Sequence, residues 1–307
     1  MALKTIVVHA DLSRHAPARI AMAVALATAH GAHLTGAAAT GVSALVFPSG
    51  PSGLPGGVLD AYFGALRDQL NSALDAFERA VAPTGLSYDK RLLIDDAGNA
   101  LAAQARYADL LVLSLDDRDE ALAHDDARLP DYAIVNAPRA VLLVPATPAP
   151  ATPAALNASA TSAVPTAPAR ASVPQSILIA WNDSRQAAAA VGHALPLLQQ
   201  ARSVVVATFS EDHPGLVSAS ATADGAAATP GAALLAYLRR HGVNARLDAR
   251  TEAVDMGHAI LTLAGNLGAD LIVAGCYGHS RLRELCLGGV SRTLLRTSPV
   301  ALMMAHL

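Results

Sequence analysis

The sequence predicts an α/β protein with two tandem doubly wound domains, each a parallel sheet with helices on both faces. Three observations predict this fold: a chain of 307 residues, a Pro/Ala-rich segment near its middle, and one order of segments repeated on either side. A prior of about 100–200 residues per domain suggests two domains. Continuous apolar strands that alternate with helices are typical of a parallel sheet covered on both faces.

The Pro/Ala/Ser/Thr-rich segment between Pro145 and Pro174 carries Arg170 as its one charged residue. Such a composition buries too little apolar area to offset the entropy of ordering, and it is typical of an extended tether. We therefore expect a first domain over residues 1–145, a linker over 146–174 and a second domain over 175–307.

Composition excludes several classes of protein. Hydrophobic residues make up 52% of the chain and aromatic residues 4%, so the apolar mass is mainly Ala, Val and Leu, which suits helices packed on a sheet. A formal net charge of −3 gives no field that would attract nucleic acid or an acidic membrane surface. Asp11 precedes any apolar run of signal-peptide length, and His30 and a Pro/Gly cluster interrupt the uncharged stretch 20–59. We expect a cytoplasmic, bacterial protein with no membrane partner.

Each half begins with a strand that ends in a polar turn, Asp11 to Arg14 in the first half and Asn182 to Arg185 in the second. Ser13 and Ser184 are the expected N-caps of Ala-rich helices that run to about residues 30 and 200. In the first half we expect next a strand at 33–39, a loop at 41–57, a helix, a strand at 87–94, a helix after Asp96, and strands at 108–113 and 140–144. In the second half we expect a strand at 203–209, a loop at 210–230, a helix, a strand at 244–250, a helix after Asp255, and strands at 269–274 and 300–304.

A glycine pattern follows the fourth strand of the second half. It reads Gly275-x-x-Gly278, nine residues, then Gly288-Gly289-Val290-Ser291, and the last four lead into a helical segment. Glycines let backbone amides approach a phosphate closely, and a helix N-terminus offers unpaired N–H donors. The pattern predicts a phosphate-binding loop, although it matches neither the P-loop nor the dinucleotide fingerprint.

With this spacing, the chain outside the linker resembles the universal stress protein family as a tandem member. The resemblance implies a five-stranded sheet in the order 3-2-1-4-5, ATP or another adenine nucleotide between strands one and four, and pairing of domains through their last strands. The binding residues that it implies in the second half are Ala180, Asn182, Thr208, Gly275, Gly278, His279, Gly288, Gly289, Val290 and Ser291. From the residues themselves we expect no catalytic residue and no dedicated metal site, because the cysteines and histidines lack the spacing of metal ligands, although Mg²⁺ could accompany ATP.

Two positions depart from the family pattern. Gly289 stands where the family has Ser or Thr, and Asn182 replaces the acid usual after the first strand. Arginines around the loop, such as Arg281 and Arg292, could neutralise phosphate or could form a solvated helix face. Cys276 could be a redox-sensitive thiol, but a small packed cysteine is the favoured interpretation.

The first half lacks the glycine pattern. The ungapped comparison that equates Ala108–Pro138 with Ala269–Pro299 sets Ser114 opposite Gly275, and the remaining motif positions become Asp117, Ala127, Arg128 and Pro130. Acids such as Asp116 and Asp126 would repel a phosphate. We expect the first half to be a structural or partner-binding copy, with an acidic metal loop as the alternative.

Three functions stay open for the chain. We favour a stress-response protein that binds an adenine nucleotide in its second domain and acts as a nucleotide-dependent regulatory module. A slow ATPase or autophosphorylating protein is one alternative, but Glu284 is the one acid between Gly275 and Ser291 and makes no convincing base. A ligand-free scaffold is the other. The two halves could also pair within one chain, or chains could form a homodimer.

Overall fold

The computed structural model describes residues 2–42, 56–115, 129–145, 172–210, 231–251, 255–276 and 289–306. Its two compact units contain residues 2–147 and 174–307, and we call them the N-terminal and C-terminal units. The expected linker lies almost wholly outside the described residues, so the boundaries at 145 and 175 stay predictions. In the described part of the chain, no helix is both long and apolar enough to cross a membrane.

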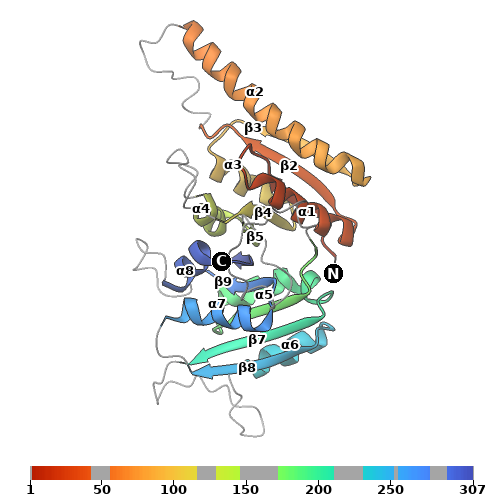
Figure 1. The fold of residues 1–307 in the computed structure, drawn as a ribbon, viewed down its shortest axis with the longest axis vertical. Helices are drawn as coiled ribbons and strands as arrows, with labels where there is room; N and C mark the ends of the chain where they lie inside the picture. The colour runs from red at the N-terminus through yellow and green to blue at the C-terminus, as the bar shows by residue number, and fades with distance from the viewer. Residues whose placement is uncertain are drawn as a thin grey trace, which may run out of the picture. The chain divides into compact units, whose positions relative to one another are not determined.

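Strands and helices alternate along the N-terminal unit (Figure 1). The elements in order are β1 (Thr5–His9), α1 (Ala16–His30), β2 (His33–Ala39), α2 (Gly56–Val81), β3 (Tyr88–Leu93), α3 (Ala97–Gln104), β4 (Leu110–Ser114), α4 (Leu129–Asn136) and β5 (Val141–Val144), with short 3-10 turns at Ala82–Thr84 and Ala105–Tyr107. The expected strands of this half are confirmed to within two residues at each end.

The C-terminal unit repeats this order. Its elements are β6 (Ser176–Trp181), α5 (Arg185–Leu198), β7 (Ser203–Ser210), α6 (Ala232–Arg240), β8 (Ala245–Thr251), α7 (Met256–Leu267), β9 (Leu271–Gly275), α8 (Gly289–Thr297) and β10 (Ala301–Ala305). Ser184 is the N-cap of α5, and its hydroxyl oxygen accepts a hydrogen bond from the amide of Ala187 at 3.1 Å.

All the strand pairs within each unit are parallel among the described residues. The order is β3-β2-β1-β4-β5 in the N-terminal unit and β8-β7-β6-β9-β10 in the C-terminal unit. Both are the predicted order 3-2-1-4-5, so the doubly wound fold is confirmed. Strand order reverses between β1 and β4, and between β6 and β9, which is where such sheets bind ligands.

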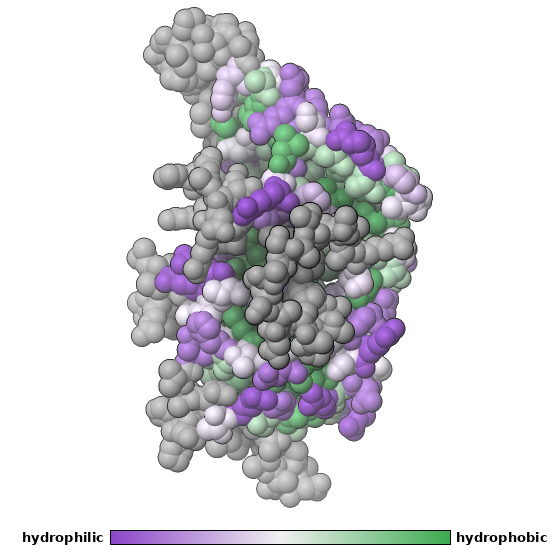
Figure 2. All heavy atoms as spheres, viewed as in Figure 1, coloured by the Kyte–Doolittle hydropathy of each residue, from purple (hydrophilic) through white to green (hydrophobic). Residues whose placement is uncertain are grey.

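Helices cover both faces of each sheet. In the N-terminal unit α1 contacts α2 and α3 contacts α4, and in the C-terminal unit α7 contacts α8. Crossovers between parallel strands are right-handed. In the N-terminal unit, a helix therefore lies on one face of the sheet where the chain crosses toward β3, and on the other face where it crosses toward β5. The central strands are therefore buried on both sides, as Ile6, Val8 and Val112 are at 0% exposure. Hydrophilic residues are spread over the visible surface with apolar residues between them (Figure 2).

An aspartate joins the start of the first and fourth strands in both units. Asp109 accepts hydrogen bonds from the amides of Lys4 and Thr5 at 2.6 and 3.0 Å. Asp270 accepts equivalent bonds from the amides of Gln175 and Ser176 at 2.8 and 3.0 Å. The repeated Ala-Asp-Leu segment thus aligns the two central strands by the same contact in each unit.

The expected N-cap at Ser13 is wrong. His15 precedes the first turn of α1 without a capping side chain, and a proline lies at the start of the helix. The Ser13 hydroxyl instead donates to Asp11 Oδ1 at 2.7 Å, and the Ser13 amide donates to the same oxygen at 3.0 Å. The carboxylate of Asp11 therefore holds the serine in the turn before the helix.

Gly36 in β2 allows close packing of α2 on the sheet. A Cβ atom at this position would lie 2.5 Å from the ring of Phe77, which is fully buried and has no room to move. We expect Gly36→Ala to lower the free energy of unfolding of the N-terminal unit by about 1–3 kcal/mol in denaturant titrations.

Gly64→Ala is the matched control in the same unit. Gly64 lies within α2, and a Cβ atom there would meet nothing within 4 Å. Alanine favours a helix over glycine, so this change should raise stability by up to about 1 kcal/mol. Equal destabilisation by both substitutions would contradict the packing argument.

Candidate functional site

The candidate site lies at the carboxyl ends of β6 and β9 in the C-terminal unit. Ala180 is near the end of β6 and half-buried, and Asn182 follows the strand with an exposed side chain. Asn182 Oδ1 accepts hydrogen bonds from the hydroxyl and the amide of Ser184 at 2.7 and 3.3 Å. The amide side chain thus performs the same turn-forming role as Asp11 but brings no negative charge.

Gly275 ends β9 directly against the first turn of α5. A Cβ atom on Gly275 would lie 2.4 Å from the backbone nitrogen of Ala187 and 2.7 Å from the backbone carbonyl carbon of Gln186. Backbone atoms cannot yield as a flexible side chain can, so the packing of α5 on β9 itself requires glycine here. The N-terminus of α5 is thereby held at the end of β9.

The first turn of α8 contains the last three predicted site residues. Gly289 is exposed, Val290 is 36% exposed, and Ser291 is 7% exposed. Gly289 does not have a left-handed backbone, and a Cβ atom there would meet nothing within 4 Å among the described residues. Neither conformation nor described packing therefore requires glycine at this position.

The other predicted site residues differ in what the structure says of them. Thr208 is 7% exposed at the end of β7, and its methyl group would be 3.0 Å from a Cβ atom on Gly231, so its side chain belongs to the packing under α6. Gly278, His279 and Gly288 lie outside the described residues, as do Arg281 and Arg283.

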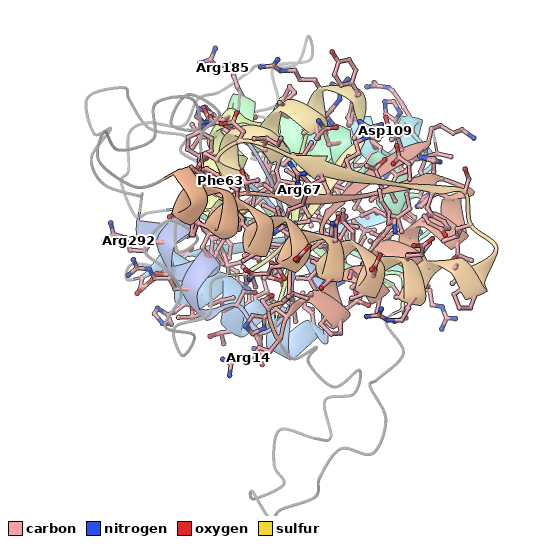
Figure 3. The ribbon with its side chains drawn as sticks, turned by 90° about the horizontal axis from the view of Figure 1, so that it is seen from above. Arg14, Phe63, Arg67, Asp109, Arg185 and Arg292 are labelled. Atoms are coloured by element: carbon pink, nitrogen blue, oxygen red, sulfur yellow. The ribbon has the colours of Figure 1, made fainter. Side chains whose placement is uncertain are left out.

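Charge at this edge comes from exposed side chains. Arg292 and Arg296 are exposed on α8, and Figure 3 shows Arg292 pointing away from the ribbon. Neither α5 nor α8 has an acid in its first turn. Asp255 caps α7, and one of its oxygens lies 2.7 Å from Nδ1 of the exposed His258.

Cys276 is fully buried directly after β9, and its amide donates to the Ala305 carbonyl at 3.0 Å. This environment fits the small packed cysteine that the sequence favoured. Among the residues that the structure describes, no group of three or more His, Cys, Asp or Glu side chains could hold a metal ion. The acidic segment 116–126 of the first half, where a metal loop was the alternative, lies outside the described residues.

At the matching edge of the N-terminal unit, a buried arginine joins the ends of β1 and β4. Arg19 is 2% exposed; its Nε donates to the His9 carbonyl at 2.8 Å and its Nη1 to Ser114 Oγ at 2.6 Å. Arg19 Nη2 lies 2.9 Å from Asp11 Oδ1, and His9 Nδ1 lies 3.3 Å from Asp11 Oδ2.

Sequence reasoning missed Arg19 and His9. The repeat itself carried the signal, because the alignment of Ser13 with Ser184 sets His9 opposite Ala180 and Arg19 opposite Ala190. Two alanines of the second half therefore correspond to a large polar histidine and arginine in the first half.

The pKa values of this cluster follow from burial and from Arg19. Burial, together with the nearby Arg19 charge, lowers the pKa of His9 to about 4 although Asp11 opposes the shift. Burial acts to raise the pKa of Asp11, but Arg19, His9 and the Ser13 hydrogen bonds lower it to about 2. At neutral pH the cluster therefore holds a neutral imidazole, a carboxylate and a guanidinium.

The stability of the N-terminal unit should depend on pH through His9. Between about pH 6.5 and pH 4 the unfolded chain binds a proton on this histidine that the folded chain does not, so stability falls as the pH falls through this window. We expect denaturant titrations at a series of pH values to give a loss of about 3 kcal/mol at most. His9→Gln should remove this part of the pH dependence.

The exposed His258 in the C-terminal unit gives the control, because its side chain is 64% exposed. His258→Gln should leave the pH dependence of the N-terminal unit unchanged. An unchanged slope in the His9→Gln protein would show that His9 titrates alike in the folded and unfolded chain.

Comparison with known proteins agrees with this fold. The universal stress protein family model matches residues 174–306. A universal stress protein from Archaeoglobus fulgidus superimposes with a TM-score of 0.67 at 12% identity, covering 98% of this chain and 97% of that one. A putative universal stress protein from Pseudomonas aeruginosa superimposes with a TM-score of 0.56 at 17% identity, covering 99% and 93%.

No curated protein matches the chain. The structural matches are below 25% identity and establish the fold over both units, whereas the family model identifies the second unit by its sequence. The C-terminal unit therefore belongs to the universal stress protein family, and the N-terminal unit repeats its fold.

Proposed function

We propose that the C-terminal unit binds ATP or another adenine nucleotide, with the phosphates at the first turn of α8, and that occupancy of this site regulates contacts with a partner in a stress response. Gly275, Gly289, Val290 and Ser291 would surround the phosphates and ribose. Ala180, Asn182 and Thr208 would lie by the base and sugar. Because the side chain of Thr208 is buried, it would support the wall of the site from behind. Mg²⁺ would accompany ATP through the phosphates.

The observation that carries this proposal is Gly289. It begins a helix at the carboxyl edge of the sheet, and neither its backbone conformation nor its described neighbours require glycine. A backbone without a side chain gives a phosphate direct access to the amides of the first turn, where the helix dipole also favours an anion.

Electrostatics at the same edge support the proposal. The first turns of α5 and α8 contain no acid, and the close packing at Gly275 holds the α5 N-terminus at the end of β9. Asn182 forms the turn after β6 without the charge that Asp11 brings in the other unit. A phosphate at this edge would therefore meet partial positive charge from two helices, and Asp183, exposed in the turn before α5, is an acid that it would have to avoid.

The N-terminal unit has the opposite arrangement. Arg19 occupies the space between the ends of β1 and β4, its charge is matched by Asp11, and α4 begins with Asp131 in its first turn. We propose that this unit binds no nucleotide. The pairing of the units through β5 and β10 also stays a prediction.

Gly275 favours a second candidate, a ligand-free scaffold. Its lack of a side chain is fully explained by the approach of the α5 backbone, so this motif glycine needs no ligand. The two candidates differ over Gly289, which has no such packing contact among the residues that the structure describes: a nucleotide-binding protein needs its open backbone, and a scaffold does not.

Gly289→Asp tests the phosphate site without disturbing the core, because the position is exposed and open, and aspartate suits a helix N-terminus. A carboxylate about 4 Å from a phosphate charge costs about 1 kcal/mol in water and about 4 kcal/mol at an effective dielectric of 20. We expect ATP affinity in isothermal titration calorimetry to fall by about tenfold or more.

Gly289→Asn is the matched control, because it has the same shape without the charge. The Gly289→Asn protein should bind ATP with an affinity close to that of the wild type, unlike the Gly289→Asp protein. Equal affinity in the wild-type and Gly289→Asp proteins would reject the α8 site, and absence of any ATP, ADP or AMP binding by the wild-type protein would favour the scaffold.

Stoichiometry tests the difference between the units. Titration of the full chain with ATP should give one nucleotide per chain, because Arg19 and Asp11 fill the equivalent edge of the N-terminal unit. Two sites of similar affinity would contradict the assignment of nucleotide binding to the C-terminal unit.

A further inference from the structure

The outer strand β8 of the C-terminal unit has a free side. In the described part of the chain, β7 is the only strand that pairs with β8, which ends the sheet of this unit (Figure 1). A strand in this position leaves a row of backbone N–H and C=O groups without a partner from the sheet. The free side of β8 can therefore pair with a further strand.

Cations gather beside the amino end of β8. We call the exposed residues Arg202, Arg239, Arg240 and Arg246 the basic cluster. They come from three neighbouring segments: the turn after α5, the last turn of α6, and β8 itself. Gln199 Nε2 donates to the His241 carbonyl at 2.8 Å, which holds the turn after α5 against the turn after α6.

The basic cluster lacks acidic partners within the described part of the chain. The described residues from Arg185 to Leu247 include no acid, and none of the four arginines forms an ion pair with a described residue. Asp248 is half-buried in β8, and it lies 3.0 Å from the Nε of Arg250. This carboxylate is therefore already matched by a cation outside the cluster.

The outer strand of the N-terminal unit shows that the fold does not require such an excess of cations. In β3, Lys90 Nζ lies 3.1 Å from Asp75 and 2.5 Å from Glu78, and Arg91 lies 3.0 Å from Asp89. Each of the two cations on this strand therefore has a carboxylate beside it.

The strand registers place a reversal of charge at one position. Thr5 and Ser176 begin matching strands, and the pairs that follow from them set Tyr88 of β3 in the place of Ala245 of β8. The next residue is Asp89 in one unit and Arg246 in the other. An acid of the first outer strand is thus an exposed arginine in the second.

The basic cluster has cations on both faces of β8. The α6 helix covers the face of Leu247, where a Cβ atom on Gly231 would lie 2.8 Å from that leucine. Arg246 lies on the opposite face, because successive side chains of a strand alternate between faces. A strand added to β8 would alternate in the same way, so acids on its successive residues would meet Arg246 on one face and the arginines of α6 on the other.

We propose that β8 binds an extended acidic segment of another protein as an additional strand, and that the basic cluster selects its carboxylates. Backbone hydrogen bonds along β8 supply affinity, and the charges supply specificity. A nucleic acid or a membrane also carries negative charge, but neither has the N–H and C=O groups that complete a strand. This surface does not depend on the nucleotide site proposed for the same unit.

Fluorescence anisotropy on the full chain tests this surface with a labelled short peptide of Val, Thr and Glu at low ionic strength. We expect a Kd on the order of 100 μM. The same peptide with Lys in place of Glu should bind at least about tenfold more weakly, because it repels the cluster. The Glu peptide with alternate backbone amides methylated keeps its charge but cannot pair with β8, and it should also bind at least about tenfold more weakly.

Charge reversals place the peptide on β8. Arg246→Glu and Arg240→Glu should each weaken binding of the Glu peptide by about tenfold or more. Arg240 lies on α6, so its effect cannot come from distortion of β8. Arg106→Glu is the matched control, because Arg106 is exposed in the N-terminal unit and the change in net charge is the same. Its affinity should stay within about twofold of the wild type.

Several outcomes would overturn the proposal. No binding of the Glu peptide, equal binding of the methylated peptide, or unchanged binding in both arginine variants would each reject strand addition at β8. Tighter binding of a short oligothymidylate would assign the cluster to nucleic acid. Dissociation of a dimer by Arg246→Glu in sedimentation would assign it to a second copy of the chain.

Competition with ATP separates this surface from the proposed nucleotide site. Saturating ATP should leave the Kd of the Glu peptide within about twofold at constant ionic strength. Displacement of the peptide by ATP would place it at the nucleotide site and reject the β8 surface. Failure of ATP to bind at all would bear on the proposed nucleotide site alone and would leave the peptide titration decisive.

Discussion

Burial of both faces of each parallel sheet is the constraint on which the rest of this structure depends. The central strands are covered by helices, so their side chains form core and their backbone groups pair with neighbouring strands. Polar chemistry is then confined to the carboxyl edge, where strand ends, turns and helix N-termini meet. Each unit has such an edge because the two units have the same fold, and the two edges differ in a few of the side chains that lie there.

Those side chains give the two edges different electrostatics. In the N-terminal unit, Arg19 occupies the gap between β1 and β4, and a buried guanidinium needs a counter-charge, which Asp11 supplies. In the C-terminal unit, Ala190 and Gly275 stand at the matching positions, and the backbone of α5 lies against the end of β9. One edge is neutralised from within, whereas the other keeps the positive ends of its helices available.

Local signals explain why so much of the fold could be predicted. Apolar runs, Ala-rich helices and the capping residues Ser184, Asp96 and Asp255 act within a few residues, so their positions are visible in the sequence. Ser13 failed because α1 begins two residues later than the repeat predicts, after His15 and with a proline in its first turn, whereas Ser184 donates to Asn182 and also caps α5. The contacts of Arg19 could not be predicted in this way, since Arg19 and Ser114 are distant in sequence and only packing brings them together. Half of the glycine pattern, including Gly278 and Gly288, lies outside the described residues and stays a prediction.

The Arg19 cluster also explains why the difference between the units is a fixed property rather than a regulated one. Moving the guanidinium away would remove its contacts with the His9 carbonyl, Ser114 Oγ and Asp11 at the same time, and a buried polar group left without its hydrogen bond costs about 1–3 kcal/mol. The same contacts that join the ends of β1 and β4 therefore also keep Arg19 at this edge of the N-terminal unit.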